Sequence, residues 1–212
     1  MRITVFGAAG AAGSRIVREA LARGHDVTAV GRSIEGLRDL PREAAVRTAD
    51  ATDAAQVRGA SAGSDVVISA TRPRPGREYE LAAVAQALLE GVRGSGARLL
   101  VVGGAGDLIV PGTGATVVQQ PDFPPDWRPI ALACHAQHEV LRSTPTDVDW
   151  TYLSPPAELE PGIRRGSYRI GADELLTDSA GVSRISMEDL AVALLDEAER
   201  PRHRHTRFTV AY

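Results

Sequence analysis

Three glycines near the start of the chain have the spacing of a turn that binds a diphosphate. Gly7, Gly10 and Gly13 follow an apolar run at residues 3–6 and precede a stretch of helical periodicity. The first glycine allows a sharp turn, the second leaves the backbone open to a pyrophosphate, and the third lets the helix pack close to the sheet. Free amides at the positive end of the helix would face the phosphates. The pattern predicts a dinucleotide site, with a purely structural turn as the alternative. The predicted cofactor residues of this turn are Gly7, Ala9, Gly10, Ala11, Ala12 and Gly13.

Arg32 and Ser33 follow the second apolar run, residues 26–31, where a dinucleotide fold contacts the adenosine ribose. An acidic residue there would accept a hydrogen bond from a free 2′-hydroxyl, whereas the guanidinium fork of Arg32 suits a 2′-phosphate. We therefore expect NADP(H) in preference to NAD(H), and the alternative is a solvated surface arginine. Asp50 and Ala51 follow the third run, at a place where the adenine amino group would be contacted.

The ends of three later apolar runs supply the remaining candidates. In an open parallel sheet, ligands bind outside the carboxyl ends of the strands, so residues that follow these runs are expected beside the nicotinamide and the substrate. For Arg72 a plain loop residue is the alternative. The predicted cofactor residues here are Ala70, Thr71, Arg72, Gly103 and Gly104, and the predicted substrate-pocket residues are Ala105, Asp107, His135, Pro155 and Pro156.

Apolar runs and helical stripes alternate along the chain and would position these residues. Runs at 3–6, 26–31, 45–49, 64–70, 98–102 and 150–153 predict strands, and the stripes between them predict helices. Asp53 is expected to cap a short helix, and Ser186 to begin a later one with Asp189 at the capping-box position. The alternation predicts a Rossmann-type doubly wound parallel sheet. Residues 1–154 form the predicted NAD(P)-binding domain, and residues 155–212 a small C-terminal substrate lobe that completes the same domain. An irregular segment at 111–129 is expected on the substrate rim.

Composition narrows the function classes. A net charge of -3 gives no reason to expect nucleic acid or an anionic membrane, and no apolar run is long enough to span a bilayer. Cys134 is the single cysteine and the first strand begins at once, so we expect a cytoplasmic protein without disulfides. His135 and Glu139 have a spacing that permits metal ligation, but no third ligand cluster accompanies them, and no metal site is predicted. All 24 basic side chains are arginine, so no mechanism can use a lysine amine.

Several motifs together resemble the atypical short-chain dehydrogenase/reductase superfamily. Within it the chain is similar to the NmrA-like branch of NADH-flavin reductases, which are related to the flavin (biliverdin-IXβ) reductases. The resemblance covers nearly the whole chain. It rests on the glycine turn at 7–13, on Gly31-Arg32-Ser33, on Ala70-Thr71-Arg72, on the stretches at 103–106, 138–143 and 183–186, and on Ser154-Pro155-Pro156. Asp107 stands where the branch often has serine.

The resemblance implies an NAD(P)H-dependent oxidoreductase, but the Tyr-x-x-x-Lys pair with which the wider superfamily reduces carbonyls is absent. A carbonyl that accepts hydride needs an acid nearby, whereas an oxidised flavin takes hydride at N5 and is neutralised by water. We therefore expect a flavin or similar planar acceptor as substrate, with His135 and Asp107 as the candidate proton donors. The alternatives are a non-catalytic NADP(H) sensor that modulates a protein partner, and an epimerase, dehydratase or ether-type reductase.

Overall fold

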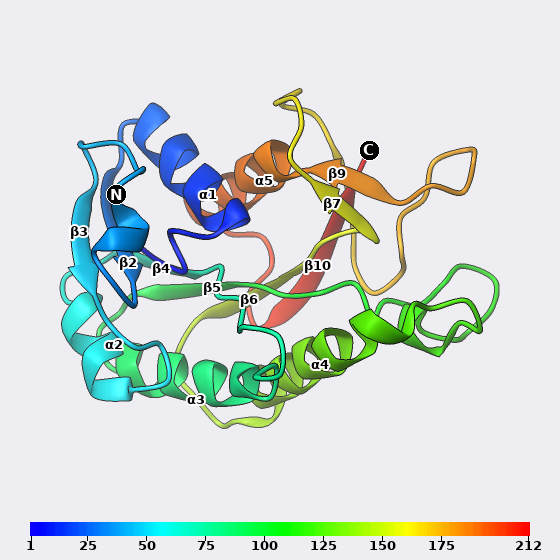
Figure 1. Cartoon of the computed structure of the whole chain (residues 1–212), viewed down its shortest axis with the longest axis horizontal. Helices are drawn as coiled ribbons and strands as arrows, with labels where there is room; N and C mark the ends of the chain where they lie inside the picture. Colours follow the sequence, from blue (N-terminus) through cyan, green and yellow to red (C-terminus); the bar gives the residue numbers. More distant parts are fainter.

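A central sheet of eight strands organises the computed structural model, which describes residues 1–212 (Figure 1). The strand order is β3-β2-β1-β4-β5-β6-β10-β8, and only β8 runs antiparallel to its neighbour. The strands are β1 (Arg2–Phe6), β2 (Asp26–Gly31), β3 (Ala45–Thr48), β4 (Val66–Ser69), β5 (Arg98–Val102), β6 (Trp150–Ser154), β8 (Arg169–Gly171) and β10 (Thr206–Ala211). β7 (Glu158–Glu160) and β9 (Arg184–Ser186) form a separate parallel pair. The predicted Rossmann-type doubly wound sheet is confirmed.

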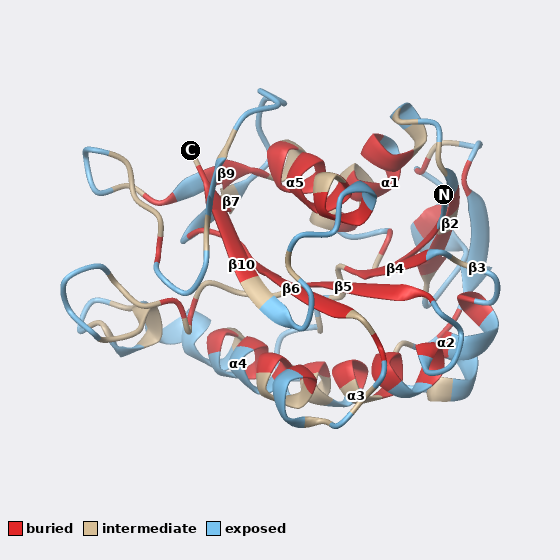
Figure 2. Ribbon diagram, turned by 180° about the vertical axis from the view of Figure 1, so that it is seen from behind, coloured by how far each residue is buried: buried red, intermediate tan, exposed pale blue.

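Two helical layers cover the sheet. In Figure 1, α1 (Ala11–Ala22) and α5 (Met187–Glu199) lie above the sheet, and α2 (Ala54–Ala60), α3 (Glu80–Val92) and α4 (Arg128–Ser143) lie below it. Strand β4 shows why both faces must be covered. Its Val66 and Ile68 join the core under α1 and α5, while Val67 joins the core above α2, α3 and α4. A continuous apolar run of this kind is typical of a strand buried on both faces. The edge strand β3 is exposed along its length (Figure 2).

Side-chain caps begin two of the helices. The Asp53 carboxylate accepts hydrogen bonds from the amides of Ala55 and Gln56, at 2.8 and 3.1 Å, so the predicted cap of α2 is confirmed. Ser186 caps α5 by accepting from the Asp189 amide at 3.0 Å. The Asp189 side chain does not complete a reciprocal capping box. It is fully buried and accepts instead from backbone amides of the 161–168 segment and from the Tyr212 hydroxyl.

The chain after residue 154 is built into the main sheet. β10 pairs with β6, β8 pairs with β10, and α5 packs beside α1. The irregular segment before α4 contains two short 3-10 helices, η2 (Val117–Gln119) and η3 (Pro125–Trp127), and a third, η1 (Glu35–Leu37), follows β2. Ile109 bridges to Glu174, which ties this segment to the C-terminal part of the chain. None of the helices combines the length and apolar character that a membrane-spanning segment needs.

Candidate functional site

The carboxyl ends of the parallel strands meet at one edge of the sheet, and the strand order reverses between β1 and β4. Gly7 and Ala70, the residues after these two strands, lie against each other there. Gly7 has a φ of +75°, and a Cβ at this position would lie 2.5 Å from the Ala70 carbonyl oxygen. Both the backbone conformation and the space therefore require glycine. A switch point of this kind is where open α/β sheets bind ligands.

The other two glycines of the turn differ in what surrounds them. At Gly13 a Cβ would overlap the Gly7 carbonyl and lie 2.8 Å from its carbon, so the helix packs directly on the turn. At Gly10 the nearest atom to a Cβ would be the Gly7 oxygen at 3.2 Å, and nothing else lies within 4 Å. Gly10 is the N-cap of α1 and brings no capping side chain, so the first amides of the helix remain available to a ligand. The turn fits a diphosphate.

The predicted adenosine residues lie together beyond this turn. A Cβ on Gly36 would lie 3.6 Å from the Ala9 Cβ, which places the loop after β2 beside the glycine turn. Hydrogen bonds from Thr52, together with the nearby charge of Arg32, lower the pKa of Asp50. Only one oxygen of the Asp50 carboxylate is used in these bonds. The other oxygen is free for an amino group such as that of adenine.

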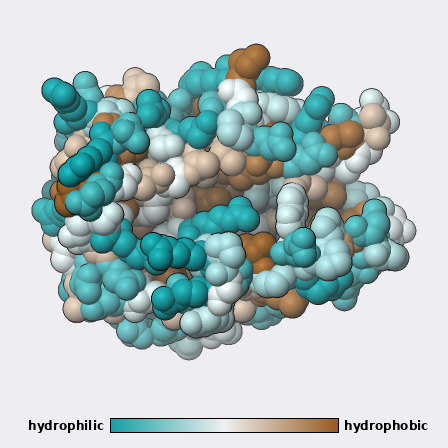
Figure 3. Space-filling view, in the orientation of Figure 1, coloured by the Kyte–Doolittle hydropathy of each residue, from teal (hydrophilic) through white to brown (hydrophobic).

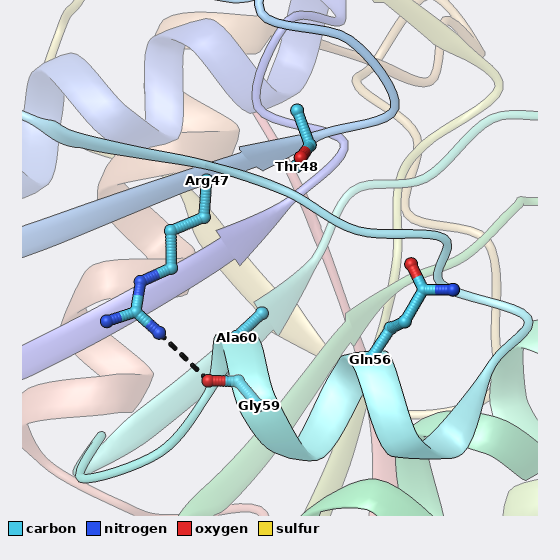
Figure 4. Close-up of a pocket in the computed structure, with 5 residues that line it drawn as sticks. All are labelled: Arg47, Thr48, Gln56, Gly59 and Ala60. Carbon is cyan, nitrogen blue, oxygen red and sulfur yellow. Dashed lines mark hydrogen bonds between the residues drawn. The ribbon is translucent and has the colours of Figure 1, made fainter.

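A pocket of about 300 Å³ lies at the outer side of β3 and α2 (Figure 4). It is lined by Arg47, Thr48, Gln56, Gly59 and Ala60. The Arg47 guanidinium donates to the Gly59 carbonyl at 2.9 Å, and the Gln56 side chain is bonded to the Asp50 amide and to Asp53. Because these polar groups are already paired within the protein, we assign the pocket no part in the candidate site.

Packing inside the protein accounts for the glycines after β5. A Cβ on Gly103 would overlap the Tyr152 ring, and one on Gly104 would lie 3.0 Å from the Cys134 sulfur. Gly103 and Gly104 are also predicted, from the sequence, to contact the cofactor. In the structure the close neighbours are side chains of β6 and α4. The turn at 103–106 is therefore held down by these elements, and its other side faces the carboxyl edge of the sheet.

Asp107 lies in a partly buried cluster of ionisable side chains. Its Oδ2 lies 3.3 Å from His138 Nδ1, 3.6 Å from His135 Nδ1 and 2.8 Å from Arg207 Nη1, the last contact lacking hydrogen-bond geometry. Burial alone would raise the pKa of Asp107, but the hydrogen bond with His138 and the charge of Arg207 outweigh burial and hold it low. The ionised form of Asp107 is therefore favoured, which argues against the predicted role as a proton donor. His135 is half-exposed beside it and remains the candidate of the two.

Two other groups near this turn hold their protons tightly. The buried Tyr152 hydroxyl donates to the Cys134 carbonyl at 2.9 Å, and burial raises the pKa of Tyr152 well above its usual value. Burial and the charge of Asp107 raise the pKa of Cys134 to about 12. Pro155 and Pro156 follow β6 at the same edge and are buried. No group of three or more His, Cys, Asp or Glu side chains is placed to bind a metal.

Figure 3 shows a hollow across the face where the upper and lower layers meet, with apolar groups on its floor and hydrophilic groups on its rims. The structure thus brings Gly7 against Ala70 and Gly13 against Gly7. It also packs Gly103 against Tyr152 and places Arg32 near Asp50. Sequence reasoning missed Arg207 and His138 as partners of Asp107. Arg207 is a hundred residues away along the chain, and no local pattern points to it.

Comparisons with known proteins agree with this geometry. A family model described as NAD(P)H-binding matches residues 7–198. YwnB, an uncharacterized protein of Bacillus subtilis, is 36% identical over 99% of this chain and 98% of its own length. A candidate exported protein from Burkholderia pseudomallei has a structure that is 40% identical, with a TM-score of 0.89 and both chains fully covered. The structure of a candidate NADH-flavin reductase from Streptococcus pneumoniae is 31% identical, with a TM-score of 0.90 over 100% of this chain and 99% of that one.

Proposed function

The chain belongs to the NAD(P)H-binding family, and on this basis we propose that it is an NAD(P)H-dependent reductase of a flavin or similar planar acceptor. The similar structure described as a candidate NADH-flavin reductase supports the proposal. The observation that carries it is the state of three groups beside the 103–106 turn, none of which is suited to donating a proton. Asp107 is ionised, Tyr152 is committed to a carbonyl, and the Cys134 thiol has a pKa of about 12.

The glycine turn fits the cofactor, because its uncapped amides and its missing side chains leave room for a pyrophosphate. When bound, the nicotinamide cofactor supplies a hydride. Ala70, Thr71, Gly103 and Gly104 follow the two strands next to the switch point, and we assign them to the nicotinamide end. Ala105, Pro155 and Pro156 would border the acceptor.

Arg32 decides which nicotinamide cofactor the site prefers. Its guanidinium stands after β2, where the adenosine ribose is read, and Ser33 is its neighbour. The Asp50 carboxylate is close enough to Arg32 for the two charges to interact. We assign Arg32 and Ser33 to the 2′-phosphate of NADPH, and Asp50 with Ala51 to the adenine.

Hydride transfer to an oxidised flavin requires contact between two flat rings and no protein acid. The electron pair of the hydride enters at N5, the resulting negative charge spreads over the ring system, and water supplies the proton. The protein has to hold the rings about 3–3.5 Å apart and exclude other acceptors. This requirement matches a site whose turn residues are glycine and alanine and whose Tyr152 hydroxyl and Cys134 thiol keep their protons.

The experiment starts with calorimetric titration of NADPH and NADH into the purified protein. The tighter cofactor is then mixed with FMN, riboflavin and quinones while the absorbance of the reduced nicotinamide is followed. We expect NADPH to bind more tightly and its absorbance to fall with a flavin. Binding without oxidation by any acceptor would refute the reductase and favour an NADP(H) sensor that acts on a protein partner.

A further inference from the structure

The loop between β4 and α3 concentrates positive charge at the carboxyl edge of the sheet. It contains Arg72, Arg74 and Arg77 within six residues, in a chain whose net charge is -3. Arg77 forms an ion pair with Glu80 at the start of α3. Arg72 and Arg74 are exposed and form no ion pair and no side-chain hydrogen bond within the protein. Two guanidinium groups therefore stand uncompensated at the edge where the ligands are expected.

Arg72, predicted from the sequence to contact the cofactor, also lies near Cys134, on the side that we assign to the acceptor. The positive charge of Arg72 is close enough to Cys134 to lower the pKa of the thiol, whereas burial and Asp107 raise it. Cys134 in turn contacts the Gly104 turn, since a Cβ there would lie 3.0 Å from its sulfur. The loop therefore extends from β4 toward α4, past the 103–106 turn. Figure 3 shows hydrophilic side chains on the lower rim of the hollow, where this loop runs in Figure 1.

Two further features favour an anion at this loop. Pro73 and Pro75 fix the backbone φ on either side of Arg74, so the loop loses less freedom when a ligand binds. The helix that follows, α3, begins at Glu80 with Tyr79 as N-cap and without a capping side chain, so its positive end points toward the same edge. Glu78, the remaining acidic residue of the loop, accepts a hydrogen bond from the Gly76 amide and forms no ion pair with either arginine.

We propose that Arg72 and Arg74 bind a phosphate or carboxylate substituent of the planar acceptor, so that the substrate class is an anionic flat molecule. This inference rests on the proposed function, because it concerns the acceptor of that same reaction. Guanidinium groups suit such substituents, since their forked N–H donors match carboxylate and phosphate oxygens.

FMN and riboflavin test the inference, because they share one ring system and differ in the phosphate. With NADPH as reductant, we expect kcat/KM for FMN to exceed that for riboflavin by about tenfold at low ionic strength and the ratio to shrink as salt is added. R74Q should lower the FMN to riboflavin ratio by about twofold to fivefold. The matched control is R93Q, which removes an exposed, unpaired arginine just after α3 and should leave the ratio unchanged.

A binding measurement separates this inference from the reductase itself. Quenching of flavin fluorescence is measured with the protein saturated by NADP⁺, for wild type, R74Q and the double variant R72Q/R74Q. Tighter binding of FMN than of riboflavin, lost in R74Q, supports the inference even if no flavin is reduced, and only the proposed function would then fail. Equal binding of the two flavins, no binding of either, or an equal loss of both in R74Q overturns the inference.

Discussion

Two alanine substitutions in the glycine turn should separate cofactor binding from folding. Gly10 has φ -72° and ψ 166°, a conformation open to any residue, and an added Cβ would meet only the Gly7 oxygen at 3.2 Å. The alanine reduces the freedom of the unfolded chain, which stabilises G10A by about 0.4–1 kcal/mol. The tight contact of its Cβ with the Gly7 oxygen, together with the weaker N-capping by alanine, costs a similar amount. The stability of G10A should thus stay within about 1 kcal/mol of wild type.

Cofactor binding should respond very differently. The added methyl group of G10A points into the space left for the pyrophosphate, and it would push the phosphates away from the amides of α1. Charged hydrogen bonds contribute about 1.5–3 kcal/mol each, so losing one or two of them weakens NADPH binding by at least about tenfold to hundredfold. At Gly13, by contrast, a Cβ would overlap the Gly7 backbone. G13A should therefore destabilise the fold by about 2–3 kcal/mol or more.

Thermal denaturation followed by circular dichroism, together with calorimetry of NADPH binding, checks both expectations. A suitable control is G59A in α2, because no atom lies within 4 Å of the added Cβ. It should stabilise the helix by up to about 1 kcal/mol and leave binding unchanged. If G10A folds normally and binds NADPH as wild type does, the glycine turn is not the pyrophosphate site and the reasoning fails.

Three further predictions follow from the charged groups. R32E should lower the affinity for NADPH by about tenfold to hundredfold and raise the relative affinity for NADH, because a carboxylate beside Asp50 repels the 2′-phosphate. A competition titration measures the preference, and an unchanged preference would contradict this prediction. D107N should lower the free energy of unfolding by about 1–3 kcal/mol at pH 7. The folded pKa of Asp107 is below its unfolded value, so this difference between wild type and variant should disappear as the pH falls through the folded pKa, and urea unfolding between pH 7 and 3 measures it. E197Q should cost about 3–5 kcal/mol, because it leaves the buried Arg98 guanidinium without its 2.5 Å partner, and NADPH affinity of the folded variant should stay the same.

Local pattern was enough to predict the main elements of the fold. The apolar run at Val66, Val67 and Ile68 predicted a strand covered on both faces. The position of Asp53 before a short helical stretch predicted that its carboxylate caps the first amides of that helix. These inferences depend on neighbours in sequence, and the structure agrees with them. The three-residue strands β7, β8 and β9 could not be predicted, because so short a segment has no period to detect.

Those parts of the candidate site that the backbone forms could be predicted from the sequence, whereas contacts between side chains of distant elements could not. The role of Gly7 follows from its position directly after a strand. The ionisation of Asp107 could not be predicted, because it depends on His138 in α4 and Arg207 in β10, which only the fold brings together. For this reason the lowered pKa of Asp107 argues against the prediction that it donates a proton. A carboxyl group seen alone in a sequence has an ordinary pKa, and its partners decide whether it carries a proton.

The Arg98 cluster at the amino end of the sheet and the arginines at 72 and 74 at the carboxyl end differ in whether their charges are paired. At the amino end, the buried Glu197 carboxylate accepts a hydrogen bond from the Arg98 guanidinium and lies 2.8 Å from His203 Nδ1. At the carboxyl end, Arg72 and Arg74 are unpaired. Paired buried charges stabilise only the fold, whereas unpaired exposed ones gain interaction energy when an anion arrives. Substitutions at the two ends should therefore act on different quantities. E197Q should change stability without changing ligand affinity, and R74Q should do the reverse. If R74Q lowered stability as much as E197Q, the loop would be part of the packed fold, and its charge could not be reserved for a ligand.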